Sequence, residues 1–266
     1  MLKLSDTAKL LATIVAVALA IAGGLAAGLL GRAAAWNAFG RHSASGLPSA
    51  HRLQAAAAAL ARTATPPDAT LIARARERTI ALYHRPGARP YRTLGPLPYS
   101  YGTRPVFRVL ASRGQWLHVS LPVRPNHSSA WIRRRNADLA QTDYRVAVQL
   151  RAHRLLLWRG RRRVLGTPIA VGKALTPTPN GTYFIAYALR TLDPTSFFGP
   201  YAFGLSAYSR VLTSFAGGDG EVGIHGTNEP RLLGKSVSHG CIRIRNSVIT
   251  RLAHLLPLGT PVHIQR

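Results

Sequence analysis

Gly-Ile-His-Gly-Thr-Asn at residues 223–228 and Ser-His-Gly-Cys-Ile-Arg at residues 238–243 are the two stretches of this sequence that say most about its fold. Twelve residues separate His225 from Ser238. Cys241 is the only cysteine in 266 residues, so it forms no disulfide within the chain. A single cysteine close in sequence to histidines is a candidate nucleophile.

The residues around Cys241 suit cysteine chemistry. The reacting species is a thiolate, which needs a base within hydrogen-bond reach, and His225 or His239 can serve. Gly240 lacks a Cβ, so the chain can turn sharply there, and backbone N–H groups at Gly240 and Cys241 can face a developing oxyanion. Two alternatives stay open at this point: Cys241 as a small buried side chain, and Cys241 with two histidines as zinc ligands, although no second cysteine is present.

The charge balance excludes some chemistries. The chain has 35 basic and nine acidic residues, for a net charge of +26, and only four of the basic residues are lysines. A glycosidase needs two facing carboxylates and a two-metal hydrolase needs several, and both are poorly supplied here. So basic a chain associates with polyanions, and an arginine-rich coding bias is the alternative explanation. The charge is not arranged as in a known DNA-binding motif.

The N-terminal part predicts a membrane segment followed by a linker. Residues 10–31 carry no charge, and 22 residues are long enough to cross a bilayer of about 30 Å. We therefore expect residues 1–35 to be an uncleaved transmembrane anchor, with a cleaved signal segment as the alternative. Residues 36–76 read as a linker. The predicted location is the cell envelope, with the catalytic part outside the cytoplasmic membrane.

Residues 77–140 predict a small β module. A Pro-Gly turn at 86–87 is followed by short apolar stretches, among them the alternating Trp-Leu-His-Val at 116–119. The order of the Pro-Gly turn, Gly-Gln-Trp-Leu-His-Val, Arg-Pro-Asn and Ala-Trp-Ile resembles bacterial SH3-like domains. The resemblance implies a small barrel that attaches cell-wall enzymes to peptidoglycan, and a barrel that is only a spacer is the alternative.

Residues 144–266 predict a second, strand-rich domain. Residues 145–150 alternate between polar and apolar side chains, and residues 155–158 follow as the partner strand of a hairpin with Gly160 at the next bend. A short helix is expected from residue 246, with Asn246 as its N-cap. The fold class that follows is mainly β, with few and short helices.

The second domain resembles the YkuD-type L,D-transpeptidase catalytic domain. The resemblance rests on Ile-His-Gly-Thr-Asn, the spacer and Ser-His-Gly-Cys-Ile-Arg-Ile. It also rests on three flanking elements: Thr-Pro-Thr-Pro-Asn-Gly-Thr-Tyr-Phe-Ile at 176–185, Gly-Pro-Tyr-Ala-Phe-Gly-Leu at 199–205 and Gly-Thr-Pro-Val-His-Ile at 259–264. It covers nearly half of the chain, with a His-to-Cys spacer on the short side.

The resemblance implies a role for each motif residue. Cys241 is the acylated nucleophile, His225 its base and the Gly226 carbonyl the group that orients the base. The nucleophile loop and oxyanion site comprise Ser238, His239 and Gly240. Substrate binding is assigned to Arg243, Thr227, Asn228 and Tyr201. Arg243 has two readings, a contact to a substrate carboxylate or an ion pair with Glu229 or Asp219.

The implied activity is acyl transfer on peptidoglycan. Cys241 would release terminal D-Ala from tetrapeptide stems and pass the acyl group to an amine, which forms 3→3 cross-links. Water as acceptor gives an L,D-carboxypeptidase, a protein lysine gives a protein-to-peptidoglycan ligase, and a decayed site gives a non-catalytic wall-binding protein. We expect no metal and no cofactor. The expected partners are stem peptides and an anionic cell wall or membrane surface, not nucleic acid, and the chain is expected to be monomeric.

Overall fold

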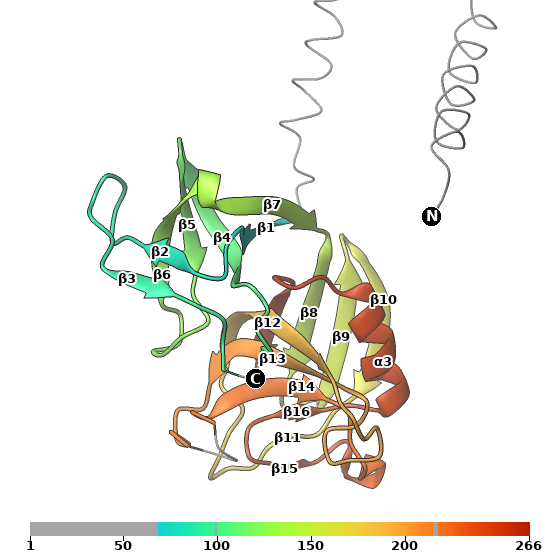
Figure 1. The fold of residues 1–266 in the computed structure, drawn as a ribbon. Coiled ribbons are helices and arrows are strands. Elements are labelled where there is room, and N and C mark those ends of the chain that lie inside the picture. Colours follow the sequence, from blue (N-terminus) through green and yellow to red (C-terminus); the bar gives the residue numbers. More distant parts are fainter. Residues whose placement is uncertain (1–68, 99, 215–217) are drawn as a thin grey trace, which may run out of the picture. The chain divides into compact units, whose positions relative to one another are not determined.

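The computed structural model describes residues 69–98, 100–214 and 218–266, and this part of the chain is mainly β, as predicted (Figure 1). Its first sheet has five antiparallel strands in the order β6-β5-β4-β1-β7. These strands are β1 (Thr70–Ala75), β4 (Val106–Arg113), β5 (Trp116–Ser120), β6 (Ser129–Arg133) and β7 (Ala137–Thr142). A two-stranded sheet of β2 (Ile80–Leu82) and β3 (Arg92–Leu94) joins it, and the 3-10 helix η2 (Arg134–Asn136) precedes β7.

The second sheet has eight strands in the order β10-β9-β8-β17-β12-β13-β14-β16. These are β8 (Tyr144–Gln149), β9 (Arg154–Arg159), β10 (Arg162–Pro168), β12 (Gly181–Arg190), β13 (Tyr201–Tyr208), β14 (Glu221–His225), β16 (Ile242–Arg243) and β17 (Pro261–Gln265). Two neighbouring pairs are parallel, β17 with β8 and β14 with β16. A small parallel sheet joins β11 (Val171–Gly172) to β15 (Ser236–Ser238), close to the 3-10 helix η3 (Pro230–Leu232).

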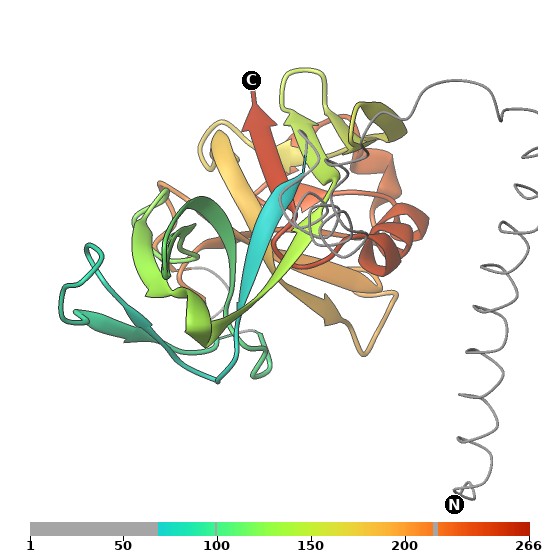
Figure 2. The same ribbon diagram turned by 90° about the horizontal axis from the view of Figure 1, so that it is seen from above.

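Each sheet has its own hydrophobic core. In the first sheet Phe107, Leu117 and Ile132 are fully buried. In the second, Val146 and Val148 of β8 are buried while their neighbours are partly exposed, which is the alternation that the sequence predicted. Figure 2 shows the green strands of the first sheet and the yellow-to-red strands of the second as separate groups. The assignment of residues 77–140 to an SH3-like domain stays a prediction.

One α-helix, α3 (Asn246–Leu255), is present among the described residues, and it buries Ile249 and Leu252 against the second sheet. The prediction that Asn246 caps this helix is wrong. Arg245 occupies the cap position without a side-chain hydrogen bond, and Asn246 is the first helical residue. Its Oδ1 atom instead accepts a hydrogen bond of 2.7 Å from the Thr227 N–H. The side chain therefore ties the helix to the loop that follows His225.

The predicted membrane localisation needs correction. In the described part of the chain, no helix has both the length and the apolar character that a membrane span requires, so the predicted anchor has no support from the structure. The segments on which the prediction rested, residues 1–35 and most of the linker 36–76, lie outside the described residues.

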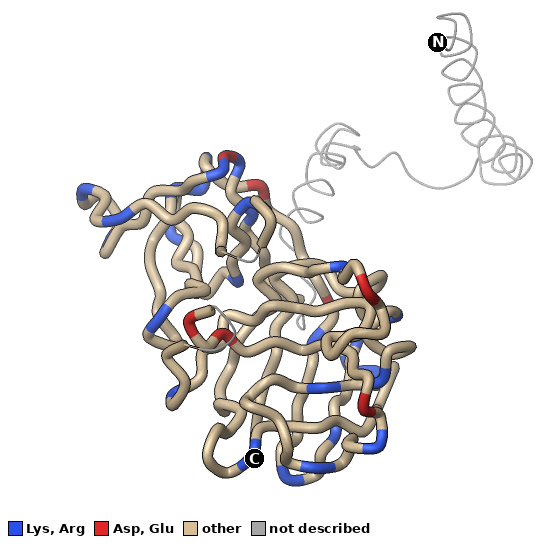
Figure 3. Tube along the Cα trace, turned by 60° about the horizontal axis from the view of Figure 1, so that its bottom comes forward, with Lys and Arg blue, Asp and Glu red and all other residues tan. Residues whose placement is uncertain are grey.

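Positive charge is spread over the described chain. Figure 3 shows lysine and arginine on loops and strands of both sheets. Three ion pairs occur among the described residues, and two of them are exposed: Arg76–Asp138 at 2.9 Å and Arg159–Asp143 at 3.0 Å. Exposed pairs of this kind contribute little to stability.

Candidate active site

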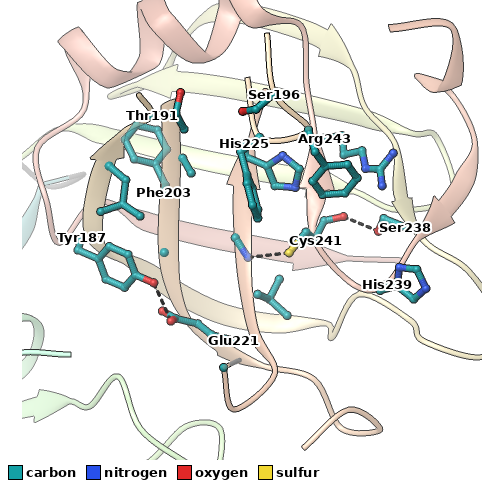
Figure 4. Close-up of a pocket in the computed structure, with 18 of the residues that line it drawn as sticks. Tyr187, Thr191, Ser196, Phe203, Glu221, His225, Ser238, His239, Cys241 and Arg243 are labelled. Atoms are coloured by element: carbon teal, nitrogen blue, oxygen red, sulfur yellow. Dashed lines mark hydrogen bonds between the residues drawn. The ribbon is translucent and has the colours of Figure 1, made fainter. Parts of the chain in front are cut away.

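Parallel pairing of β14 with β16 brings the two sequence motifs together. His225 is the last residue of β14 and lies opposite Arg243, while Cys241 immediately precedes β16. Figure 4 shows the His225 and Cys241 side chains on the same side of these strands, and both line one cavity of about 560 Å³. The structure therefore confirms that the two stretches quoted at the outset meet in space.

The His225 ring is buried and its tautomer is fixed. Its Nδ1 atom lies 2.7 Å from the Gly226 carbonyl oxygen. A carbonyl only accepts, so Nδ1 carries the proton and Nε2 of the neutral ring keeps its lone pair. Nε2 is buried and has no hydrogen-bond partner among the described residues. Burial, and to a smaller extent the charge of Arg243, lower the pKa of His225 to about 4, against the opposing effect of the Gly226 carbonyl. The ring is thus a neutral base at physiological pH.

The Cys241 thiol lies beside a backbone donor. The Gly223 N–H points at Sγ over 3.4 Å. A side chain at Gly223 would crowd the neighbouring strand, since a Cβ there would lie 2.9 Å from the Phe203 carbonyl oxygen. Burial raises the pKa of Cys241, the Gly223 N–H lowers it, and the nearby Glu221 carboxyl raises it again. With His225 neutral, the resting pair is a thiol and an imidazole rather than an ion pair.

The loop before Cys241 is held by hydrogen bonds. Gly240 has φ +122°, a conformation that favours glycine, and its hypothetical Cβ would meet no atom closer than 3.8 Å, so the backbone angle explains its presence. The Gly240 N–H donates to Ser238 Oγ over 3.1 Å, and Ser238 Oγ donates to the Cys241 carbonyl over 2.6 Å. The Gly240 N–H is thus engaged, and the prediction that it faces an oxyanion is not supported.

Residues 173–178 support the same loop from outside. Thr178 Oγ1 donates to the Gly240 carbonyl over 2.8 Å, and Thr176 Oγ1 donates to the Ser238 carbonyl over 3.2 Å. Both threonines belong to the Thr-Pro-Thr-Pro stretch that the family resemblance picked out. That stretch therefore shapes the nucleophile loop, a role that the sequence did not indicate.

Of the two roles that the sequence left open for Arg243, the structure shows the ion pair. Its guanidinium is buried, with a side chain 6% exposed, and its Nη1 donates to Glu229 Oε2 over 3.1 Å. The ion pair is therefore with Glu229. The Arg243 Cζ atom also lies 4.2 Å from the centre of the Phe197 ring, and the buried Nε has no partner among the described residues. Arg243 also lines the cavity, and its contact to a substrate carboxylate stays a prediction.

The remaining predicted residues fall into two groups. Ser238 and His239 line the cavity with Cys241; His239 is exposed, and its Nε2 lies 3.4 Å from Lys173 Nζ. Outside the cavity lining are Gly226, Gly240, Thr227, Asn228 and Tyr201. Thr227 is buried, and its hydroxyl accepts from the Glu229 N–H. Substrate binding by Thr227, Asn228 and Tyr201 stays a prediction.

Several cavity residues were missed in the sequence. Phe197 and Phe198 place their rings 5.4 and 5.0 Å from the His225 ring, which excludes water from it.

Across the cavity, Tyr187 OH donates to Glu221 Oε2 over 2.7 Å, and Glu221 Oε1 is buried without a partner (Figure 4). Glu221 shares a face of β14 with His225, at i and i+4, and this spacing was the available signal. Among the described residues, no three His, Cys, Asp or Glu side chains are grouped as a metal ion would need.

Glu221 gives a prediction for stability. Burial raises its pKa from 4.5 to about 7, the Tyr187 hydrogen bond lowers it, and Asp219 raises it. Between pH 4.5 and pH about 7 the Glu221 carboxyl is ionised in the unfolded chain and still protonated in the folded chain. The free energy of unfolding therefore falls as pH rises, and this loss is complete above pH about 7. Glu221→Gln should therefore stabilise the protein at pH 8 by about 1–2 kcal/mol after solvent screening, or about 2–8 °C in unfolding temperature.

The measurement is thermal unfolding of both proteins at pH 4 and pH 8. Little difference is expected at pH 4, where Glu221 is neutral in the folded chain and mostly neutral in the unfolded chain. Glu77→Gln is the matched control, since it makes the same substitution at an exposed position. An equal shift at both pH values would show that Glu221 carries no charge-dependent penalty.

Comparison with known proteins gives a consistent result. The family model of the L,D-transpeptidase catalytic domain, YkuD, matches residues 143–264. A protein of Bacillus licheniformis named putative L,D-transpeptidase YkuD is 42% identical over 130 residues, which cover 49% of this chain and 69% of that protein. Its Bacillus subtilis namesake is 41% identical over 123 residues, or 46% of this chain and 66% of that protein.

Among solved structures, the catalytic domain of the Enterococcus faecium L,D-transpeptidase is 28% identical, with a TM-score of 0.34, over 46% of this chain and 97% of that one. The Bacillus licheniformis protein carries the assignment, because 69% of it is matched at 42% identity. The family model, residues 143–264, includes every cavity-lining residue except Tyr101. The chain belongs to the YkuD family of L,D-transpeptidase catalytic domains.

Proposed function

We propose that the chain is a cysteine acyltransferase that cross-links peptidoglycan stem peptides, with Cys241 as nucleophile and His225 as its base. One observation carries the proposal: the Gly226 carbonyl fixes the proton on His225 Nδ1, Nε2 is left without a hydrogen-bond partner among the described residues, and His225 lines the same cavity as Cys241, the only cysteine of the chain. The Gly226 carbonyl orients the histidine ring, as a carboxylate does in many catalytic triads. The scarcity of acidic residues is no obstacle to this arrangement.

The first half-reaction consumes a tetrapeptide donor. His225 Nε2 takes the thiol proton as Sγ attacks the carbonyl carbon of the third residue. The bond from that carbon to the nitrogen of terminal D-Ala breaks, and His225 returns the proton to the leaving amine. A thioester on Cys241 remains. The Cys241 N–H is proposed to stabilise the oxyanion, in place of the Gly240 N–H that Ser238 occupies.

The second half-reaction transfers the acyl group. A side-chain amine of a diamino acid on a neighbouring stem attacks the thioester carbon and gives its proton to His225. The carbon–sulfur bond breaks, an amide forms and the thiolate recovers the proton. The product is a 3→3 cross-link. Arg243 is proposed to contact a substrate carboxylate, since it lines the cavity beside its ion pair with Glu229.

Product analysis tests the choice of acceptor. The full chain is incubated with a tetrapeptide donor, a second stem peptide with a free diamino-acid amine, and a lysine-containing protein peptide at equal concentration. We expect D-Ala and the 3→3 dimer as the main products. If the tripeptide is the only stem product, the chain is an L,D-carboxypeptidase. If the lysine-containing peptide is acylated, the chain is a protein-to-peptidoglycan ligase.

The non-catalytic alternative predicts a different result. A decayed site would release no D-Ala in that experiment, and an inert Cys241 would not react with iodoacetamide in the folded protein. Cys241 is not fully buried as a residue and lines the cavity, which supports the catalytic reading.

A further inference from the structure

One wall of the catalytic cavity comes from the connection between β13 and β14. Its residues Ser209, Leu212 and Gly220 line the cavity, and Glu221 follows directly. We call the described residues 209–214 and 218–220 the wall segment. Two residues beyond Glu221, the Gly223 N–H contacts Cys241 Sγ. The position of the wall segment is thus linked along one strand to the nucleophile.

The wall segment is held by an arginine from the other sheet. Arg124, in the loop between β5 and β6, donates from Nη1 to the Ser209 carbonyl over 3.0 Å and from Nη2 to the Leu212 carbonyl over 2.9 Å. Its Nε and Nη2 both donate to the Asp219 carbonyl, over 3.1 and 2.6 Å. The planar Arg124 guanidinium therefore donates hydrogen bonds to carbonyl groups at both ends of the wall segment. It can do so because its N–H donors point in several fixed directions.

A second side chain of the same loop fixes the end of β13. Asn126 Nδ2 donates to the Tyr208 carbonyl, and Asn126 Oδ1 accepts from the Tyr208 N–H, both over 2.8 Å. The Asn126 side-chain amide thus forms the same two hydrogen bonds with the Tyr208 backbone that a residue of a neighbouring strand would form. The Tyr208 hydroxyl returns a hydrogen bond of 2.8 Å to the Pro122 carbonyl, and Arg124 Cζ lies 5.2 Å from the centre of the Tyr208 ring. We call residues 121–128 the clamp loop.

The packing leaves the wall segment little freedom beneath Arg124. Gly220 has φ +77°, and a Cβ there would collide with the Leu212 carbonyl oxygen and lie 2.9 Å from Arg124 Nη2. Tyr101, from the chain between β3 and β4, lines the same cavity. The chain outside the catalytic family match therefore contributes both a lining residue and the contacts that hold one wall.

We propose that the clamp loop is a positioning element of the active site and that Arg124 is its positioning residue, acting on substrate binding through the wall segment. The inference rests on the proposed function for its substrate, a tetrapeptide stem. It assigns to the first sheet a part in the reaction beyond that of a spacer. None of these contacts involves Cys241 or His225, so substrate binding should change more than the chemical step.

Arg124→Ala tests the proposal in the full chain. Loss of the four hydrogen bonds should raise KM for the tetrapeptide about tenfold, with kcat changed less than threefold. A loosened wall also admits water to the buried thiol, so iodoacetamide should alkylate Cys241, the only cysteine, several times faster. Arg124→Lys, which keeps the charge and fewer donors, should lie between the two proteins.

Arg76→Ala is the matched control, because it removes the arginine of an ion pair within the first sheet. A merely structural role of Arg124 would lower the unfolding temperature and leave KM, kcat and the alkylation rate as in Arg76→Ala, and this result would overturn the proposal. If Arg124→Ala does not fold, Arg124→Lys and Asn126→Ser decide by the same criteria. If the wild-type chain does not turn over the tetrapeptide, the proposed function fails while the alkylation rates still test the clamp.

Discussion

Cys241→Ala should abolish D-Ala release from a tetrapeptide donor and leave no acyl adduct on the protein. Removing a nucleophile that acts together with its base lowers the rate by roughly 10⁶-fold. No other cysteine can replace it in this chain. The fold should survive, because Sγ has only a weak contact with the Gly223 N–H and alanine fits the same space. The measurements are D-Ala release, intact mass after incubation with donor, and thermal unfolding.

Cys241→Ser tests whether the reaction needs the thiol itself or only a side chain of similar size. The hydroxyl fills nearly the same volume, but it ionises far less readily than a thiol, so the rate should remain close to that of Cys241→Ala. Ser236→Ala on strand β15 is the control, since the Ser236 hydroxyl contacts His153 Nε2 and the residue lies outside the lining of the catalytic cavity. D-Ala exchange by folded Cys241→Ala would refute the assignment of the nucleophile.

The fold could be predicted where the sequence repeats a local rule. The strand at 145–150 was predicted from alternation, and β8 follows that alternation with Val146 and Val148 buried. Residues 70–75 were placed in the linker, although β1 pairs with both β4 and β7 in the middle of the first sheet. The two partners lie far along the chain, and no local pattern specifies such pairing.

The site was predictable in its chemistry and less so in its supports. Cys241 and His225 stand out as residue types at a characteristic spacing. Their partners do not, because the Gly223 N–H and the Gly226 carbonyl are backbone groups that every residue has. Asn246 was read as a helix cap because asparagine favours that position, but tertiary structure gives its side chain to Thr227 instead.

His225→Gln should lower the rate of D-Ala release by about 10²–10⁴-fold, the usual contribution of a general base. Glutamine keeps a polar group near the thiol but cannot take its proton at neutral pH. Because the wild-type pair rests as thiol and imidazole, loss of the base should affect thioester formation more than substrate binding. The measurements are kcat and KM with the same tetrapeptide donor, and an effect confined to KM would contradict the assigned role.

The pH profile distinguishes a general base from a merely structural histidine. The pKa of His225 is lowered to about 4, so kcat/KM of the wild-type enzyme should fall only below that pH and stay level up to the raised pKa of Cys241. Without the base, the reaction depends on the small thiolate fraction, so the rate of His225→Gln should rise tenfold per pH unit until the thiol ionises. Iodoacetamide has no titrating group, and its reaction with Cys241 measures that ionisation separately. An acid limb near pH 6.5 in the wild-type profile would show that His225 titrates as an exposed histidine does, and the buried, neutral base would then be wrong.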